Sequence, residues 1–274
     1  MKVVTYGIRG SIPMSHEGGS RYGGNTSCMT VESGGSYLIV DAGSGLMLLN
    51  KKLSAANPDY PRNVKYNFLL SHLHYDHIIG FGTFPPVWER DNDIKIYTCS
   101  RNEKPLNEQI FGIFEPPYWP RSLLSASGAK FIEVWNGVPF EIDGFKVRPF
   151  AANHANKTIS FEITDGKKTF VHLLDSEMEG MEQALYDELL EVCTNADLVV
   201  FDSAYSKEDY PKLKGWGHST VEQGVALAKI CKPKRMLFSH FGQQYDDAEL
   251  DSWARFFEGE TEFIMGTDGT VVNM

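Results

Sequence analysis

The stretch Ser71-His72-Leu73-His74-Tyr75-Asp76-His77 places three histidines and one aspartate within six residues. It follows an apolar run at residues 66–70, which predicts a buried strand. Neutral imidazole binds zinc, iron and similar divalent ions, and a carboxylate can share or bridge them. In an extended segment the side chains of residues i and i+2 point the same way, so the first two histidines can bind one metal. If the chain then turns, the aspartate and the third histidine can face a second metal. The alternative, a polar surface loop, is rarely so dense in histidine.

The composition bounds the class of protein. The chain has 274 residues, a length that suits one α/β domain, and we predict a single domain over residues 1–274. Its hydrophobic content of 42% is ample for a core, and no apolar run approaches the roughly 20 residues of a membrane helix. The first residues lack the apolar segment of a signal peptide, and the four cysteines are scattered. We therefore expect a cytoplasmic protein with reduced thiols and no membrane contact.

The net charge restricts the partners. A formal charge of −10 disfavours a nucleic acid partner, because neutralising a phosphate backbone needs clustered lysine and arginine. It does not exclude a small phosphorylated substrate, since bound metal ions supply local positive charge.

Hydrophobic periods and turn residues predict strands that alternate with helices. Strands are expected at residues 2–7, 29–32, 36–40, 66–70, 94–98, 130–134, 138–142, 145–150, 158–164, 168–174, 198–201 and 235–239, with a closing strand pair at 262–265 and 270–272. Helices are expected at residues 46–53, 104–111, 180–193, 220–231 and 248–258. Residues 9–25 are rich in glycine, serine and proline and predict a long loop, which in a compact domain is more often functional or mobile. The alternation indicates a layered α/β fold.

Four further polar residues lie where predicted strands end: His154, Asp175, Asp202 and His240. Side chains at strand ends converge at one edge of a sheet, where α/β proteins place their sites. A structural role explains any single one of them nearly as well. The four together, added to the histidine-rich stretch, favour a functional site.

The pattern His-x-His-x-Asp-His resembles the signature of the metallo-β-lactamase fold superfamily. Three further elements, Gly-Ser-x-Pro from residue 10, Gly-Gly-Asn-Thr-Ser-Cys from residue 23 and Asp-Ala-Gly-Ser-Gly-Leu from residue 41, resemble the branch that contains tRNA 3′-processing endonucleases and cyclic-nucleotide and related phosphodiesterases. The resemblance implies a four-layer αββα sandwich with a mono- or dinuclear metal site at one edge, and usually hydrolysis.

The resemblance also implies a ligand set of seven residues. It assigns His72, His74 and His154 to a first metal, Asp76, His77 and His240 to a second, and Asp175 to a bridge between them. Two divalent ions would then lie roughly 3.5–4 Å apart, as in other two-metal hydrolases. Zinc is the expected metal, with manganese or iron as alternatives. The implied reaction is attack on phosphorus by a hydroxide that the two metals share, and Asp76 counts as catalytic as well as a ligand.

A second element, Gly215-Trp216-Gly217-His218-Ser219-Thr220, precedes a predicted helix. The same branch carries a similar Gly-His-Ser-Thr element, whose histidine contacts phosphate and assists the leaving oxygen. Asp202 resembles the acidic residue that pairs with this histidine, although the RNA-processing pattern has glutamate there. A carboxylate behind an imidazole fixes its tautomer and raises its basicity, which suits general acid catalysis. The alternative for His218 is a neighbour of the helix cap.

Other residues receive structural interpretations or remain open. We expect Asp41 to orient the backbone around the metal-binding loop, His172 to point away from the metals, and His16 to be exposed to solvent. The aromatic and proline-rich residues 111–120 are interpreted either as a lid or substrate wall above the metals, or as packing against the core or a dimer partner.

Taken together, the sequence predicts a metal-dependent hydrolase, specifically a phosphodiesterase acting on a small or nucleotide-like phosphodiester such as a cyclic nucleotide. One alternative is a tRNA 3′-processing endonuclease, which the acidic charge and the lack of a long basic Gly/Pro-rich arm disfavour. The other is a non-hydrolytic, iron-bearing sensor or redox module, which the resemblance disfavours because such members often replace the second histidine of the motif with glutamate, whereas His74 is retained here. Members of this branch are often dimers, so a homodimer is also expected.

Overall fold

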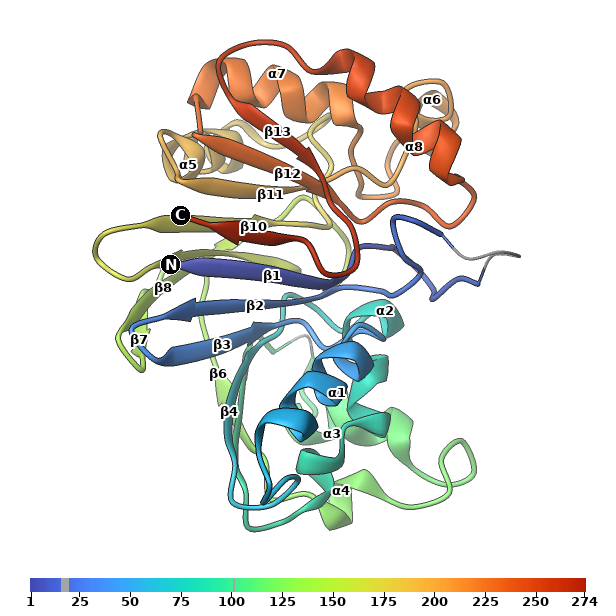
Figure 1. Ribbon diagram of the computed structural model, residues 1–274, viewed down its shortest axis with the longest axis vertical. Coiled ribbons are helices and arrows are strands. Elements are labelled where there is room, and N and C mark those ends of the chain that lie inside the picture. Colours follow the sequence, from blue (N-terminus) through green and yellow to red (C-terminus); the bar gives the residue numbers. More distant parts are fainter. Residues whose placement is uncertain (16–19, 101) are drawn as a thin grey trace.

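The computed structural model describes residues 1–15, 20–100 and 102–274, and it consists of two seven-stranded sheets with helices on their outer faces (Figure 1). This arrangement is the predicted αββα sandwich. The expectation for His16 lies outside the described residues.

The first sheet has the strand order β14-β1-β2-β3-β4-β5-β6. Its strands are β1 (Lys2–Gly7), β2 (Cys28–Ser33), β3 (Ser36–Val40), β4 (Lys65–Leu69), β5 (Asp93–Thr98), β6 (Lys130–Glu133) and β14 (Val271–Asn273). The pairs from β14 to β3 are antiparallel, and those from β3 to β6 are parallel.

The second sheet has the order β13-β12-β11-β10-β9-β8-β7. Its strands are β7 (Phe140–Ile142), β8 (Phe145–Ala151), β9 (Ile159–Thr164), β10 (Thr169–Leu173), β11 (Leu198–Asp202), β12 (Arg235–Ser239) and β13 (Glu262–Met265). It too has an antiparallel half, from β7 to β10, and a parallel half, from β10 to β13.

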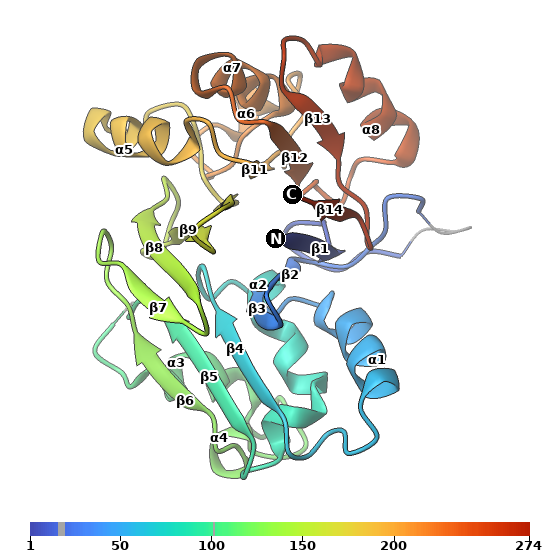
Figure 2. The same cartoon turned by 60° about the vertical axis from the view of Figure 1, so that its left-hand side comes forward.

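The helices lie on the two outer faces of the sandwich. The first sheet is covered by α1 (Leu46–Ala56), α3 (Leu106–Phe111) and α4 (Leu123–Ala126), and the second by α5 (Gln183–Cys193), α7 (Val221–Cys231) and α8 (Asp247–Trp253) (Figures 1 and 2). Shorter helices are α2 (Tyr75–Ile78), α6 (Tyr210–Leu213) and the 3₁₀ turns η1 (Ile79–Thr83), η2 (Pro85–Trp88), η3 (Gly112–Phe114) and η4 (Ala254–Phe256). Helix α7 begins at a capping box in which Thr220 and Gln223 exchange hydrogen bonds, as its sequence predicts.

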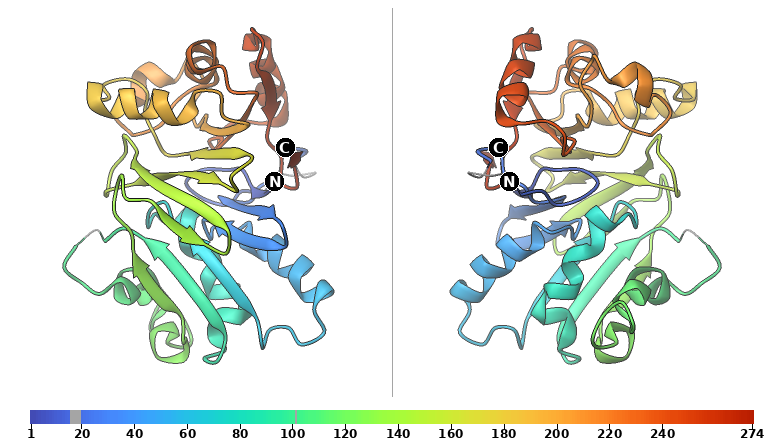
Figure 3. Two further views of the ribbon diagram at one scale, coloured as in Figure 1. Left: turned by 90° about the vertical axis from the view of Figure 1, so that its left-hand side faces the viewer. Right: turned by 90° about the vertical axis from the view of Figure 1, so that its right-hand side faces the viewer.

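The core follows from the alternation of side chains along each strand. In β11, Leu198 and Val200 belong to the apolar cluster between the two sheets, whereas Val199 and Phe201 belong to the cluster beneath α5 and α7. A third cluster lies between the first sheet and its helices. Three apolar clusters therefore hold four layers together. The layers are seen from two sides in Figure 3.

One predicted pairing is wrong. The strands near residues 262–265 and 270–272 do not pair with each other, because β13 pairs with β12 in the second sheet and β14 pairs with β1 in the first. The backbone of Thr5 at the edge of β1 accepts from Gly269 and donates to Thr270, which fixes the crossing between the sheets. Strand β14 therefore lies at the edge of the first sheet and β13 at the edge of the second, instead of the two forming a hairpin.

None of the four cysteines forms a disulfide in the described part of the chain, and three of them are buried. Within the described ranges, no helix has both the length and the apolar character needed to cross a membrane.

Candidate metal centre

The polar residues predicted from strand ends converge where the two sheets meet. The stretch 71–77 follows β4 in the first sheet, and His154, Asp175 and His240 follow β8, β10 and β12 in the second. Among the described residues, potential ligands form three overlapping groups that share Asp175. Two of them consist of these residues and are the groups that the resemblance implied, and the third joins Asp175 and His240 to Asp202 and His218.

The first group contains His72, His74, His154 and Asp175. His74 Nδ1 lies 2.9 Å from His72 Nε2 and 3.3 Å from His154 Nε2. The Oδ1 atom of Asp175 lies 3.7 Å from His72 Nε2 and 3.8 Å from His154 Nε2. Three imidazole nitrogens and one carboxylate oxygen thus lie close together. Zinc takes ligands of both kinds in proteins.

The second group contains Asp76, His77, Asp175 and His240. His77 Nε2 lies 3.3 Å from Asp76 Oδ2 and 3.2 Å from Asp175 Oδ2. His240 Nε2 lies 3.6 Å from Asp76 Oδ2 and 3.3 Å from Asp175 Oδ1. All four residues are buried. Asp175 therefore takes part in both groups: its Oδ1 atom lies near ligand atoms of each, and its Oδ2 atom lies near His77.

Unpaired buried atoms test whether these residues fit metal ions. His77 Nε2 and Asp175 Oδ2 are both buried and make no hydrogen bond among the described residues, although they lie only 3.2 Å apart. A buried polar atom without a partner is costly, so such atoms ordinarily face a bound ion or water. The donor set and these two orphaned atoms both fit divalent cations.

The protonation states of the first group and of the carboxylates point the same way, whereas at His77 burial is outweighed by the surrounding carboxylates, which raise its pKa as long as no cation balances them. Burial lowers the pKa of His72, His74 and His154, which keeps their rings neutral and their lone pairs free. Burial opposes ionisation of Asp76 and Asp175, but the surrounding imidazoles outweigh it and lower the pKa of both carboxyls. Both carboxylates are therefore charged at neutral pH, and cations would balance them.

A buried carboxylate behind the first sheet's ligands sets their orientation. Asp41 Oδ2 accepts a hydrogen bond from His77 Nδ1 at 2.7 Å, and its Oδ1 accepts from the backbone N–H of Ser71 at 2.9 Å. The bond to Nδ1 leaves His77 Nε2 to face the second group. The predicted orienting role of Asp41 is therefore present, and it extends to a ligand side chain.

His172, which was expected to point away from the metals, belongs to none of the ligand groups. Its ring lies fully buried, with Nε2 at 3.6 Å from Asp41 Oδ2. Asp175 lies beyond the end of β10 and adopts a φ of +51°. Asp41 and His240 share this left-handed conformation, with φ of +59° and +67°. Such strain in non-glycine residues costs of order 1–3 kcal/mol each and clusters at functional sites.

His218 lies beside the two groups with its own carboxylate. Its Nδ1 is 2.8 Å from Asp202 Oδ2, and its ring stacks on His240 with centroids 5.0 Å apart. Burial lowers the pKa of His218, but Asp202 outweighs this effect and raises it to about 9. The predicted pairing with the shorter aspartate side chain is therefore formed. At neutral pH the ring is protonated and directed at the centre.

Sequence reasoning missed Glu177, which holds the loop that carries His218. Its buried carboxylate accepts hydrogen bonds from the backbone N–H groups of Gly215 and Gly217 and from the hydroxyl of Tyr210. The carbonyl of Gly217 in turn lies 2.9 Å from His154 Nδ1. A Cβ added to Gly217 would lie 2.1 Å from that same nitrogen, so glycine is required there. Glu177 thus positions two histidines through one loop, and no local sequence signal marks it.

Arg9 was also missed. Its side chain is fully buried and donates to the carbonyls of Gly23, Gly242 and Tyr245, which ties the loop after β1 to the loop after His240. The only signal for this role is the glycine-rich composition of residues 9–25. Arg9 touches no ligand and is structural.

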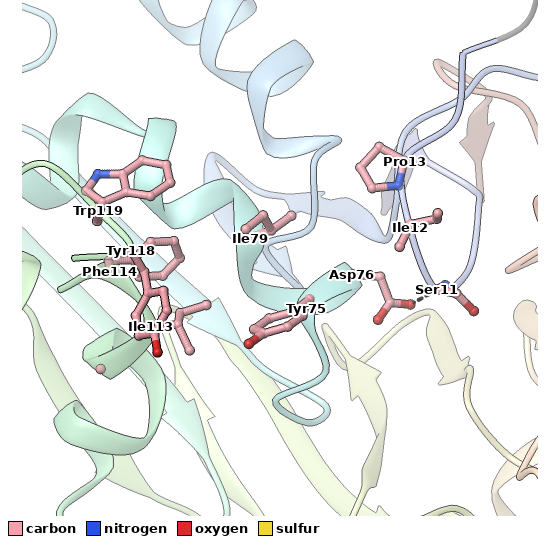
Figure 4. Close-up of a pocket in the computed structure, with 11 residues that line it drawn as sticks. Ser11, Ile12, Pro13, Tyr75, Asp76, Ile79, Ile113, Phe114, Tyr118 and Trp119 are labelled. Carbon is pink, nitrogen blue, oxygen red and sulfur yellow. Dashed lines mark hydrogen bonds between the residues drawn. The ribbon is translucent and has the colours of Figure 1, made fainter. Parts of the chain in front are cut away.

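A pocket of about 580 Å³ opens beside Asp76. Part of the segment 111–120 forms its wall, including Phe114, Tyr118 and Trp119 (Figure 4). Both interpretations left open for this segment hold in part: Phe111 and Phe114 are buried in the core of the first sheet, while Phe114, Tyr118 and Trp119 line the pocket beside the candidate centre.

Comparison with known proteins places the chain in a family. The profile described as "Beta-lactamase superfamily domain" matches residues 37–241. The Ribonuclease Z of Archaeoglobus fulgidus is 21% identical over 294 residues, covering 89% of this chain and 88% of that protein. The zinc phosphodiesterase ELAC protein 1 of Homo sapiens is 36% identical over 75 residues, which cover 27% of this chain and 19% of that protein.

Solved structures agree on the fold. The metallo-beta-lactamase fold protein YhfI from Bacillus subtilis matches with a TM-score of 0.69 at 20% identity, covering 99% of this chain and 98% of that chain. Human tRNase Z, short form, matches with a TM-score of 0.68 at 19% identity, covering 100% of this chain and 99% of that chain. Because the family profile spans most of the sequence, the chain belongs to the beta-lactamase superfamily. Its sandwich matches the solved structures along nearly the whole chain, so it has the metallo-β-lactamase fold.

Proposed function

We propose that this protein is a metal-dependent hydrolase that cleaves a phosphodiester bond in a small or nucleotide-like molecule. The observation that carries the proposal is Asp175, which belongs to both ligand groups, with the hydrogen-bonded pair of His218 and Asp202 beside them. Relatives named Ribonuclease Z and zinc phosphodiesterase support action on phosphodiesters.

In this proposal the two groups hold two divalent ions. His72, His74 and His154 would hold the first, Asp76, His77 and His240 the second, and Asp175 would bridge them. Bound ions would lower the pKa of a water to give a nucleophile and would offset the charge of the phosphate. Zinc suits the mixture of nitrogen and oxygen donors, and manganese or iron would also accept them.

His218 and Asp202 would handle the leaving group. A protonated His218 can donate a hydrogen bond to a phosphate oxygen and then pass its proton to the departing alkoxide. Asp202 holds the ring through Nδ1, so Nε2 is the atom that donates. A residue that supplies such a proton contributes typically about 10²–10⁴-fold to the rate.

The test is turnover of bis(p-nitrophenyl) phosphate and cyclic nucleotides by protein loaded with zinc, manganese or iron. Wild type is compared with Asp175→Ala and His218→Ala, and the metal content of each is measured by elemental analysis. We expect Asp175→Ala to lose metal and activity together, and His218→Ala to keep its metal while losing activity on cyclic nucleotides, whose leaving group is an alkoxide. Failure of the metal-loaded wild type to cleave any of these diesters would refute the proposal.

A tRNA 3′-processing endonuclease is the second candidate. It is favoured by the alignment with Ribonuclease Z along nearly the whole chain, and opposed by the net charge of −10. The distinguishing measurement is trimming of a precursor tRNA at low salt, where electrostatic binding is strongest. Trimming at a rate above that of small diesters would establish this alternative in place of the first.

A further inference from the structure

The pocket beside Asp76 is built from three separate segments. Residues 11–13 of the loop after β1 form one side, Tyr75 and Ile79 lie in the middle, and residues 112–119 form the opposite side (Figure 4). Its volume of about 580 Å³ lies within the range of small-molecule pockets. Among the described residues that line it, Asp76 is the only charged one and none is cationic.

The pocket is continuous with the candidate metal centre through Asp76. The Oδ2 atom of Asp76 accepts a hydrogen bond from the backbone N–H of Ser11 in the pocket wall at 2.8 Å. The same oxygen lies 3.3 Å from His77 Nε2 in the second ligand group. A phosphate held at the centre would therefore have one of its substituents at the mouth of this pocket.

The aromatic wall is preformed. Trp119 packs edge-on against Phe114 with ring centroids 5.4 Å apart, and Phe114 is fully buried against Phe111. A Cβ added to Gly82 would lie 2.6 Å from the Trp119 ring, so this position accepts only glycine without moving the wall. The wall is thus anchored in the core of the first sheet and does not need a ligand to form.

The rim carries large apolar side chains that have no cover. Tyr75 is 63% exposed, Tyr118 is 84% exposed and Ile12 is 56% exposed. Three such side chains around one pocket make an apolar patch, and patches of this kind mark binding sites. Aromatic rings in the wall favour another ring, which they can contact by edge or by face.

We propose that this pocket binds an uncharged aromatic ring attached to the scissile phosphate and so selects the substrate. This inference rests on the proposed phosphodiesterase function. Rings fit because the wall offers Tyr75, Tyr118 and Trp119, whereas a second phosphate would meet a carboxylate and no cation. The pocket therefore favours a compact aryl or base-like group over the next unit of a polynucleotide.

The experiment measures ring binding separately from turnover. Calorimetry gives the dissociation constants of phenylphosphonate and methylphosphonate for metal-loaded protein, since the two ligands share an anion and differ only in the ring. We expect wild type to prefer phenylphosphonate by at least about tenfold, as burial of a ring predicts. Trp119→Ala and Tyr118→Ala should each reduce this ratio at least about threefold with little effect on methylphosphonate. Tyr118 is 84% exposed, so its replacement leaves the fold intact.

The control is Trp135→Ala, which removes another exposed indole that does not line the pocket and should keep the wild-type ratio. Equal affinities in wild type, no binding of phenylphosphonate, or a ratio unchanged by both wall variants would each overturn the inference. Turnover of bis(p-nitrophenyl) phosphate without ring preference would leave the proposed function standing and remove only the pocket's role. A ring preference without turnover of any diester would refute the proposed function and leave the binding of a ring in this pocket standing.

Discussion

The two sheets contribute to the candidate centre in different ways. The first sheet supplies four of its ligands from one seven-residue stretch, Ser71 to His77, and one buried carboxylate, Asp41, stands behind them. The second sheet supplies His154, Asp175 and His240 one at a time from three strand ends, and it adds His218 from a loop. One side of the centre is local in sequence, and the other exists only when the sheet is assembled.

The difference separates two tasks. Ligands in one short stretch are positioned by local backbone geometry and need little beyond Asp41. Ligands from distant strands are positioned by the sheet and by loops that Glu177 and Asp202 hold. We therefore expect changes behind the first sheet to affect metal affinity, and changes behind the loop of the second sheet to affect the chemical step.

Removing the one residue that serves both ligand groups should have the largest effect. Asp175→Ala removes the carboxylate that both groups share, so the positive charge of bound cations is less well balanced. We expect activity to fall by more than about 10³-fold, beyond the 10²–10³-fold typical of losing a single stabilising donor. Elemental analysis should show less metal bound per chain than in wild type. Full occupancy of two ions in this variant would contradict the bridging role.

Removing His218 should have the next largest effect and should leave the ligands untouched. We expect His218→Ala to lower kcat by roughly 10²–10⁴-fold on substrates with alkoxide leaving groups, because a proton donor is lost. The loss should be much smaller for p-nitrophenyl esters, whose leaving group needs no proton. An equal loss on both kinds of substrate, or loss of metal, would show that His218 acts otherwise than as an acid.

The two sides of the centre also differ in how well they could be predicted from the sequence. The stretch 71–77 is legible because all its ligands share one short segment after an apolar strand, and strand ends pointed to His154, Asp175, Asp202 and His240. Glu177 was not predictable, since its partners Gly215 and Gly217 lie about forty residues away and are backbone groups. The pairing of β14 with β1 was not predictable for a related reason, because tertiary contacts decide which partner a strand takes.

The two orienting carboxylates give a direct test of the division. Asp41→Asn leaves one acceptor oxygen where His77 Nδ1 and Ser71 need two, so we expect metal affinity to fall by about 10–100-fold. Glu177→Gln loosens the loop that contacts the ligand His154 and carries His218, so we expect kcat to fall about tenfold, with a smaller loss of metal affinity than in Asp41→Asn. Chelator titration measures the first quantity and steady-state kinetics the second. The same pattern of losses in both variants would remove the distinction between the two sides.

The smallest effect should appear in the pH profile. The folded-state pKa of His218 is raised to about 9 because Asp202 outweighs burial, so the protonated donor is present below that pH and is lost as pH rises through it. This loss gives kcat an alkaline limb. Bound cations disfavour the protonated ring and move the limb to lower pH, but they act on wild type and variant alike.

Asp202→Asn removes the charge that raises the pKa of His218. We expect the alkaline limb of kcat to move down by about one pH unit or more, as loss of a charged hydrogen bond predicts. The control is His218→Ala, which should lack this limb altogether. If the limb vanishes in His218→Ala but stays in place in Asp202→Asn, Asp202 positions the ring and its charge does not raise the pKa of His218.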